Sequence, residues 1–142
     1  MYLLDTDVVS ESRKLASGRA DRAVAAWLSA VDPAVTYLSA ITIFELEHGV
    51  LLTERRDPVQ GAMLRSWLAE TVLPAFEGRV LPMSAEVATR CARLHIPDPR
   101  GERDSWIAAT ALVHDLTVVT RNIADFTRTG VSIVNPWAPP GA

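Results

Sequence analysis

Four acidic residues, widely separated in the chain, could together form a metal-binding site. Asp5, Glu45, Asp104 and Asp125 each lie near a point where a strand-like segment meets a helix or a loop. If such carboxylates converge to about 4 Å, each like-charge pair costs roughly 4 kcal/mol at an effective dielectric of about 20, so the group must take up protons or bind cations. Oxygen ligands favour Mg²⁺ or Mn²⁺, and phosphodiester hydrolysis is a reaction that these ions support.

Each acid also has a purely structural alternative. Asp5 could cap the helix that follows it, although neighbouring polar side chains could do so equally well. Glu45 could complete a capping box with Thr42, three residues earlier. Asp104 would be favourable in the first turn of any helix, and Asp125 could be a turn residue. We expect the four to act together, because the fold predicted below gives them a common location.

The pattern of apolar residues predicts alternating strands and helices. Short apolar and β-branched segments predict five strands, at residues 1–5, 35–39, 79–83, 116–121 and 131–137. Apolar residues at helical spacing predict helices at 6–14, 21–31, 40–52, 58–76, 84–95 and 103–115. The segments 96–102 and 122–130 are rich in turn residues and are predicted as loops, the second with at most one helical turn.

Local signals set several helix boundaries. Asp21 and Ser84 are predicted N-caps, and Thr42 with Glu45 is predicted to form a capping box. Gly78 is expected to close the long helix that begins at Pro58.

This order of elements predicts an α/β fold, a three-layer sandwich around a central, mostly parallel five-stranded sheet. Residues 1–137 are predicted to form one domain, followed by a Pro-rich tail at 138–142. In open parallel sheets, ligands bind beyond the carboxyl ends of the strands, where the strand order reverses. The four acids are placed to meet at that edge.

Composition sets the broad class. The chain has 142 residues, enough for one domain with its own core, and its net charge of −3 does not suggest a protein that coats nucleic acid. The single cysteine, Cys91, is predicted to be a core residue. No apolar segment reaches the ~18 residues of a membrane span, and the N-terminus does not resemble a signal peptide, so we expect a cytoplasmic protein without membrane contact.

The basic residues are almost all arginine. Lys14 is the only lysine among the 14 basic residues. Arginine suits bidentate contacts to phosphate, but a GC-rich genome would produce the same bias.

Four segments together resemble a known family. The sequences LLDTDVVSE, SAITIFELEHG, RDSWIAATAL and VVTRNIADF occur in the order and with the acids found in PIN-domain ribonucleases, specifically the VapC-type toxins of bacterial toxin–antitoxin pairs. The resemblance implies a Mg²⁺-dependent endoribonuclease, with Mn²⁺ as a possible substitute, that forms a homodimer and is neutralised by a cognate antitoxin. It places Asp5, Glu45, Asp104 and Asp125 at the family's catalytic, metal-binding positions, with Asp5 and Asp104 as the commonest direct ligands.

Residues beside these acids also follow or depart from the family pattern. Asp7 stands where many relatives have Asn, which adds negative charge near the metal. Thr120 and Asn122 could orient water or carboxylates, and Arg121 could contact phosphate; a structural role is equally open for each. Trp106, next to Asp104, is expected in the core or an interface. The three histidines share no close spacing and are expected to be core or surface residues.

The resemblance also suggests where the antitoxin binds. Its C-terminal segment is expected in an apolar groove and is expected to insert a basic side chain among the acids, as a cation would. Five apolar residues are candidates for this groove, although a core role explains each equally well: Trp27, Phe44, Leu51, Leu52 and Trp67.

Two other functions remain open at this stage. The sequence Asp5-Thr6-Asp7 after a strand also fits haloacid-dehalogenase-like phosphatases, in which the first aspartate attacks phosphorus. Those enzymes need a lysine late in the chain, and here the only lysine is Lys14. The second alternative is a module that binds RNA or an antitoxin without cleaving RNA.

Overall fold

The computed structural model describes residues 1–138 and contains the predicted parallel sheet. Its five strands are ordered β3-β2-β1-β4-β5, and all four pairings are parallel. The strands are β1 (Tyr2–Leu4), β2 (Thr36–Ser39), β3 (Val80–Leu81), β4 (Thr117–Val119) and β5 (Ile133–Val134). Of the tail expected at 138–142, all but the first residue lies outside the described residues.

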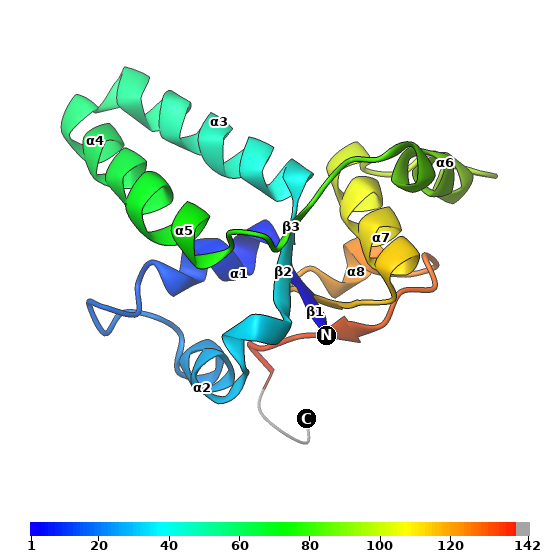
Figure 1. Ribbon diagram of the computed structural model, residues 1–142, viewed down its shortest axis with the longest axis horizontal. Coiled ribbons are helices and arrows are strands. Elements are labelled where there is room, and N and C mark those ends of the chain that lie inside the picture. Colours follow the sequence, from blue (N-terminus) through cyan, green and yellow to red (C-terminus); the bar gives the residue numbers. More distant parts are fainter. Residues whose placement is uncertain (139–142) are drawn as a thin grey trace.

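Helices cover both faces of this sheet (Figure 1). In Figure 1, α1 to α5 lie mainly on one side and α6 to α8 on the other, so the three-layer prediction is confirmed. The helices are α1 (Thr6–Ser12), α2 (Arg22–Ala30), α3 (Ala40–Arg56), α4 (Pro58–Trp67), α5 (Leu73–Ala75), α6 (Ala85–Leu94), α7 (Glu102–His114) and α8 (Ile123–Phe126). A 3₁₀ turn (Pro33–Val35) precedes β2, and a π-helical segment, η2 (Leu68–Val72), joins α4 to α5.

The two faces of the sheet are built by alternation along its central strands. Leu4 and Val119 are buried against α1, α3 and the π-helical segment. Leu3 and Val118 point to the opposite face and pack against α7. Because successive side chains of a strand point to opposite faces, a short apolar strand contributes to both halves of the core.

The strand order reverses between β1 and β4. The chain leaves β1 toward β2 and β3, then crosses to the other side of β1 to form β4 and β5. Helices that start or end at this edge diverge to opposite faces, which leaves space beyond the carboxyl ends of β1 and β4. Asp5 follows β1 directly and Thr120 follows β4 directly, so both lie at this reversal.

Most predicted caps are confirmed, and one is wrong. The side chains of Asp21 and Ser84 accept hydrogen bonds from first-turn amides of α2 and α6. The capping box expected at Thr42 is not formed, because α3 begins two residues earlier and Ser39 caps it. Thr42 is instead fully buried within the first turn. A hydroxyl three residues before Glu45 was therefore not a helix-start signal here.

The helix predicted at 58–76 is interrupted. It consists of α4, the π-helical segment and α5, and Gly78, at φ +78°, follows its end as predicted. The preceding helix continues to Arg56, and Asp57 then caps α4 through the amides of Val59 and Gln60.

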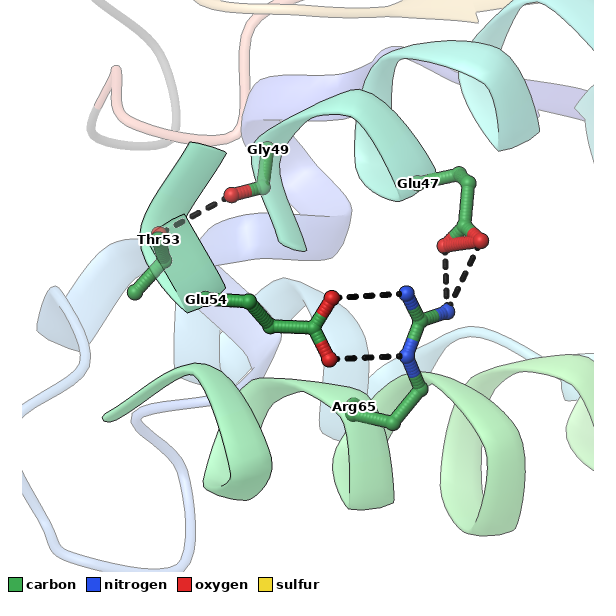
Figure 2. Close-up of polar contacts among 5 residues, drawn as sticks. All are labelled: Glu47, Gly49, Thr53, Glu54 and Arg65. Atoms are coloured by element: carbon green, nitrogen blue, oxygen red, sulfur yellow. Dashed lines mark hydrogen bonds and ion pairs between the residues drawn. The ribbon is translucent and has the colours of Figure 1, made fainter. Parts of the chain in front are cut away.

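An ion-pair network holds α3 and α4 together as an antiparallel hairpin (Figure 2). The Arg65 guanidinium on α4 donates to both carboxylate oxygens of Glu47 and to both oxygens of Glu54 on α3. Gly61 lies where the two helices are closest, since a Cβ atom there would be 2.4 Å from Cα of Glu54. Among residues 1–138, no helix is long and apolar enough to cross a membrane.

Candidate metal centre

Asp5 is fixed at the carboxyl end of β1 by hydrogen bonds to both of its carboxylate oxygens. Oδ1 accepts from the backbone amide of Thr6 at 2.7 Å, and Oδ2 accepts from the Thr120 hydroxyl at 2.8 Å. Asp5 is also the N-cap of α1. The same side chain therefore has the structural role considered above and lies at the candidate site. The side chain is only 5% exposed, so its charge faces little water.

Thr120 connects this carboxylate to the turn after β4. Its hydroxyl donates to Asp5 and accepts from the backbone amide of Asn122 at 3.0 Å. The side chain is fully buried. Thr120 therefore sets the orientation of the Asp5 carboxylate, whereas Asn122 contributes through its main chain.

Asp7 lies beside Asp5 on the first turn of α1. Its Oδ2 accepts from the backbone amide of Arg121 at 3.0 Å. Its Oδ1 is buried and has no hydrogen-bond partner among the described residues. Since a buried carboxylate oxygen without a donor is costly, this oxygen is suited to receive a cation or a water bound to one. The Arg121 guanidinium itself is stacked on Trp137, 4.4 Å from the ring centroid.

Glu45 reaches the site from α3 through two polar contacts. Oε1 accepts from the Thr6 hydroxyl at 2.8 Å, and Oε2 lies 3.7 Å from Nη1 of Arg103. The Arg103 guanidinium also lies 4.9 Å from the centre of the Phe44 ring. Thr6 thus links the Asp5 and Glu45 carboxylates, through its amide and its hydroxyl respectively.

Asp104 and Asp125 approach from the other side of the sheet reversal. Asp104 is in the first turn of α7 and is partly buried, and Asp125 is on α8 and is exposed. Both line one polar hollow of about 420 Å³. The N-cap of α7 is Gly101, where a Cβ would be 3.4 Å from Oδ2 of Asp104.

Burial raises the pKa of three of these acids, and for Asp5 and Asp104 neighbouring acids add to the rise. Burial, followed by the charge of Asp7, raises the pKa of Asp5 from 3.8 to about 7, and Asp104 adds to the rise. Burial also raises the pKa of Asp104, followed by the charges of Asp125 and Glu45. Burial raises the pKa of Asp7 as well. All four predicted site residues therefore belong to one electrostatic neighbourhood.

The acids do not close into a complete metal cage. Among residues 1–138, no three Asp, Glu, His or Cys side chains are close enough together to hold an ion by themselves. Ionised carboxylates repel one another unless a cation lies between them, so electrostatics favours a spread arrangement of the protein groups alone. The donor set still fits Mg²⁺ or Mn²⁺, because it contains only oxygen and includes the unpartnered Asp7 oxygen.

Sequence reasoning missed two contributors to this site. Thr6 and Arg103 are not among the candidates predicted from sequence, although they directly follow Asp5 and directly precede Asp104, respectively. Their roles depend on Glu45, about forty positions or more away in the chain, so no local pattern indicates them. Trp106 and Cys91 pack in the apolar interior, as expected.

The five candidates for an antitoxin groove divide into two groups. Phe44, Leu51 and Leu52 are between 51% and 54% exposed on α3. Trp27 and Trp67 are partly buried and pack against the core cluster that contains Leu4, and Trp67 also lines an apolar pocket of about 300 Å³.

Comparison with known proteins gives one consistent family. The PIN domain family matches residues 2–131. The VapC ribonuclease Y4jK of Sinorhizobium fredii is 38% identical over 98% of this chain and 99% of its own length. Toxin FitB of Neisseria gonorrhoeae is also 38% identical, over 96% of this chain and 99% of its own.

Solved structures agree with this result. The crystal structure of FitAcB from Neisseria gonorrhoeae superimposes with a TM-score of 0.87 at 36% identity, over 98% of this chain and 100% of that one. A toxin-antitoxin complex from Klebsiella pneumoniae gives a TM-score of 0.68 at 27% identity, over 98% and 100%.

The fold and the acid-lined strand edge define a PIN-type nuclease domain. The chain belongs to the PIN-domain family, among its VapC-type ribonucleases. Dependence on a divalent metal is a general property of PIN-domain ribonucleases. The phosphatase alternative is not supported, because the only lysine, Lys14, lies on the surface and pairs with Glu11 at 3.1 Å.

Proposed function

We propose that this chain is a Mg²⁺-dependent endoribonuclease that acts as the toxin of a toxin–antitoxin pair. The observation that carries the proposal is the buried Asp5 carboxylate, held by the Thr6 amide and the Thr120 hydroxyl where strand order reverses, within a chain of the PIN-domain family. A site that raises carboxylate pKa by burial and like charge gains stability when a cation enters it. The predicted domain, residues 1–137, is consistent with the family match at 2–131.

Asp5, Glu45, Asp104 and Asp125 are proposed as the metal-binding and catalytic residues, with Asp5 and Asp104 as direct ligands. Asp7 adds a fifth carboxylate, whose free oxygen faces the same neighbourhood. When bound, Mg²⁺ supplies positive charge for the negative charge that develops on the phosphoryl oxygens and lowers the pKa of water. Mn²⁺ prefers the same oxygen ligands and is a proposed substitute.

The surrounding side chains hold these groups in position. Thr120 and Thr6 fix the Asp5 and Glu45 carboxylates through hydroxyl donors, which limits how far either can rotate. Ionised carboxylates so held can accept hydrogen bonds from water and orient it toward phosphorus. No Ser, Cys or His nucleophile is needed in this scheme.

Three further expectations follow from family membership. The substrate is RNA in the cytoplasm, the chain forms a homodimer, and a cognate antitoxin neutralises it. The exposed apolar side chains Phe44, Leu51 and Leu52 on α3 support a protein contact on that helix. An arginine from the antitoxin could pair with the clustered acids in place of a cation.

RNA cleavage by the purified chain tests the proposal. We expect cleavage of single-stranded RNA in Mg²⁺ and none in EDTA. Asp5→Asn and Glu45→Gln should each lower the cleavage rate by roughly 10²-fold or more, because each removes a charge that acts on the metal.

Circular dichroism should show that both variants remain folded. Retained cleavage by both variants would contradict the assignment of these residues. RNA binding without cleavage by the unsubstituted chain would favour the non-cleaving module instead.

A further inference from the structure

Two neighbouring hollows at the edge of the site share two arginines. The first, of about 420 Å³, is lined by Asp104 and Asp125 together with Arg100 and Arg128. The second, of about 320 Å³, is lined by the same two arginines and by residues of the 96–99 loop. The two arginines therefore line both the hollow that contains the acids and the hollow beside it.

Arg100 is held in place by neutral partners. Its Nε donates to the carbonyl oxygen of Leu94 at 2.9 Å, and its Nη1 donates to that of Thr127 at 3.0 Å. These bonds fix the guanidinium without neutralising it. Arg128 is exposed, on a backbone with φ +66°. Within residues 1–138, neither guanidinium forms an ion pair with a carboxylate.

Two neighbouring arginines that form no ion pair with a carboxylate of residues 1–138 are suited to bind phosphate. Guanidinium groups contact phosphate oxygens bidentately, and here they lie beside acids that would otherwise repel a polyanion. Asp104 and Asp125 repel a phosphate unless a cation is bound, whereas Arg100 and Arg128 attract it directly. A phosphodiester next to the cleaved one would contact Arg100 and Arg128.

The second hollow combines polar and apolar groups beside the same arginines. Ile96 is 77% exposed, and Pro97, Asp98 and Pro99 are the other loop residues in the lining. A volume of about 320 Å³ lies at the lower end of the range of small-molecule sites, which begins at about 300 Å³. An exposed apolar side chain next to a phosphate-binding group can make van der Waals contact with an unstacked nucleobase.

We propose that Arg100 and Arg128, with the 96–99 loop, form a subsite for the nucleotide adjacent to the cleaved phosphodiester of single-stranded RNA. This inference rests on the proposed function. The arginines bind the phosphate, and Ile96 contacts the base. Arg100 and Arg128 act as positioning residues that hold the strand so that the neighbouring phosphodiester lies among the acids.

RNA binding measured without cleavage tests this subsite. The probe is a short, fluorescein-labelled single-stranded RNA of mixed sequence, titrated in Mg²⁺ with the full chain carrying Asp5→Asn, and Kd is followed against KCl concentration. Arg128→Asn removes the charge while tolerating positive φ, and Arg128→Lys keeps the charge. Arg22→Asn on α2, across the sheet from the hollows, is the control for net charge.

We expect Arg128→Asn to raise Kd about three- to tenfold and to reduce the slope of log Kd against log salt by about 0.7. Arg128→Lys and Arg22→Asn should leave that slope unchanged. Ile96→Ser should raise Kd roughly threefold without altering the slope, since it removes apolar contact and no charge.

Equal effects of Arg128→Asn and Arg22→Asn, or no effect of either, would overturn the subsite. If the parent chain binds no RNA, both the subsite and the proposed function fail. If it binds RNA, and Arg128→Asn weakens binding as expected, but the unsubstituted chain cleaves nothing, only the proposed function fails.

Discussion

The hydroxyl of Thr120 donates a 2.8 Å hydrogen bond to Oδ2 of Asp5, joining two residues that are 115 positions apart in the chain. The contact is buried and lies at the carboxyl ends of β1 and β4, which are paired in the sheet. This hydrogen bond fixes the direction of the Asp5 carboxylate at the point where the strand order reverses. The same bond lowers the pKa of Asp5, against the larger effects of burial and of Asp7.

Replacing Thr120 with Val should therefore change how cleavage depends on pH. The substitution keeps the shape of the side chain and removes the donor, so the pKa of Asp5 should rise further. We expect the acidic limb of the rate profile to move to higher pH, and the free energy of unfolding to fall by about 1–2 kcal/mol.

Thr110→Val is the matched control, since Thr110 is equally buried but donates to the Trp106 carbonyl within α7. It should alter stability without moving the profile. An unchanged profile in Thr120→Val would show that this bond does not influence the reacting groups.

Asp5 should make the protein less stable as pH rises. Its pKa is about 7 in the folded protein and 3.8 as an ordinary side chain, so the folded state holds the proton more tightly. The resulting stabilisation is complete below pH ~4 and is lost as pH rises toward about 7, by up to about 4 kcal/mol.

Asp5→Asn removes this titration. In EDTA, the variant should be more stable than the unsubstituted chain at pH 8, and the difference should shrink toward pH 4. Urea unfolding at several pH values measures it. A difference that does not depend on pH would contradict the raised pKa.

Arg103 should weaken metal binding, because its guanidinium pairs with the Glu45 carboxylate. Arg103→Ala is expected to increase Mn²⁺ affinity roughly threefold to tenfold, since it removes a competing positive charge near the acids. Isothermal titration with Mn²⁺ measures this. Arg90→Ala, an exposed arginine on α6, changes net charge equally and should have little effect. Weaker Mn²⁺ binding by Arg103→Ala would show that Arg103 does not compete with the metal ion for Glu45.

Alanine substitutions at the two glycines of the α3–α4 hairpin should have opposite effects on the stability of the protein. Gly61→Ala places Cβ 2.4 Å from the backbone of Glu54 and should destabilise the protein by about 2–4 kcal/mol. Gly49→Ala, in α3, meets nothing within 4 Å and should stabilise it by about 0.5–1 kcal/mol. Thermal unfolding of both variants tests the close approach of the helices. Equal effects would mean that α3 and α4 do not meet at Gly61.

Sequence predicted the fold well because its signals are local. The strand at Leu3 and Leu4 is apolar on both faces, and caps such as Asp21 act within three residues. The π-helical interruption at Leu68–Val72 was not predicted, since apolar spacing does not distinguish it from an α-helix. The capping box at Thr42 was wrong because Ser39 offered an equally good cap nearer the strand end.

The site was only partly predictable for a related reason. The acids are recognisable because each lies at an element boundary, and parallel strands bring such boundaries to one edge. The groups that orient or oppose them are not recognisable in this way. Thr6 and Arg103 both act on Glu45 through tertiary contacts, and nothing in their own surroundings along the chain specifies that partner.

The most direct test of the account is a crystal of this chain soaked in Mn²⁺ and measured for anomalous scattering. We expect an anomalous peak beyond the carboxyl ends of β1 and β4, coordinated by Asp5 and Asp104, with the other acids in contact directly or through water. Absence of a peak there at saturating Mn²⁺, or a peak bound only by residues elsewhere, would contradict the central claim that these acids form one metal centre.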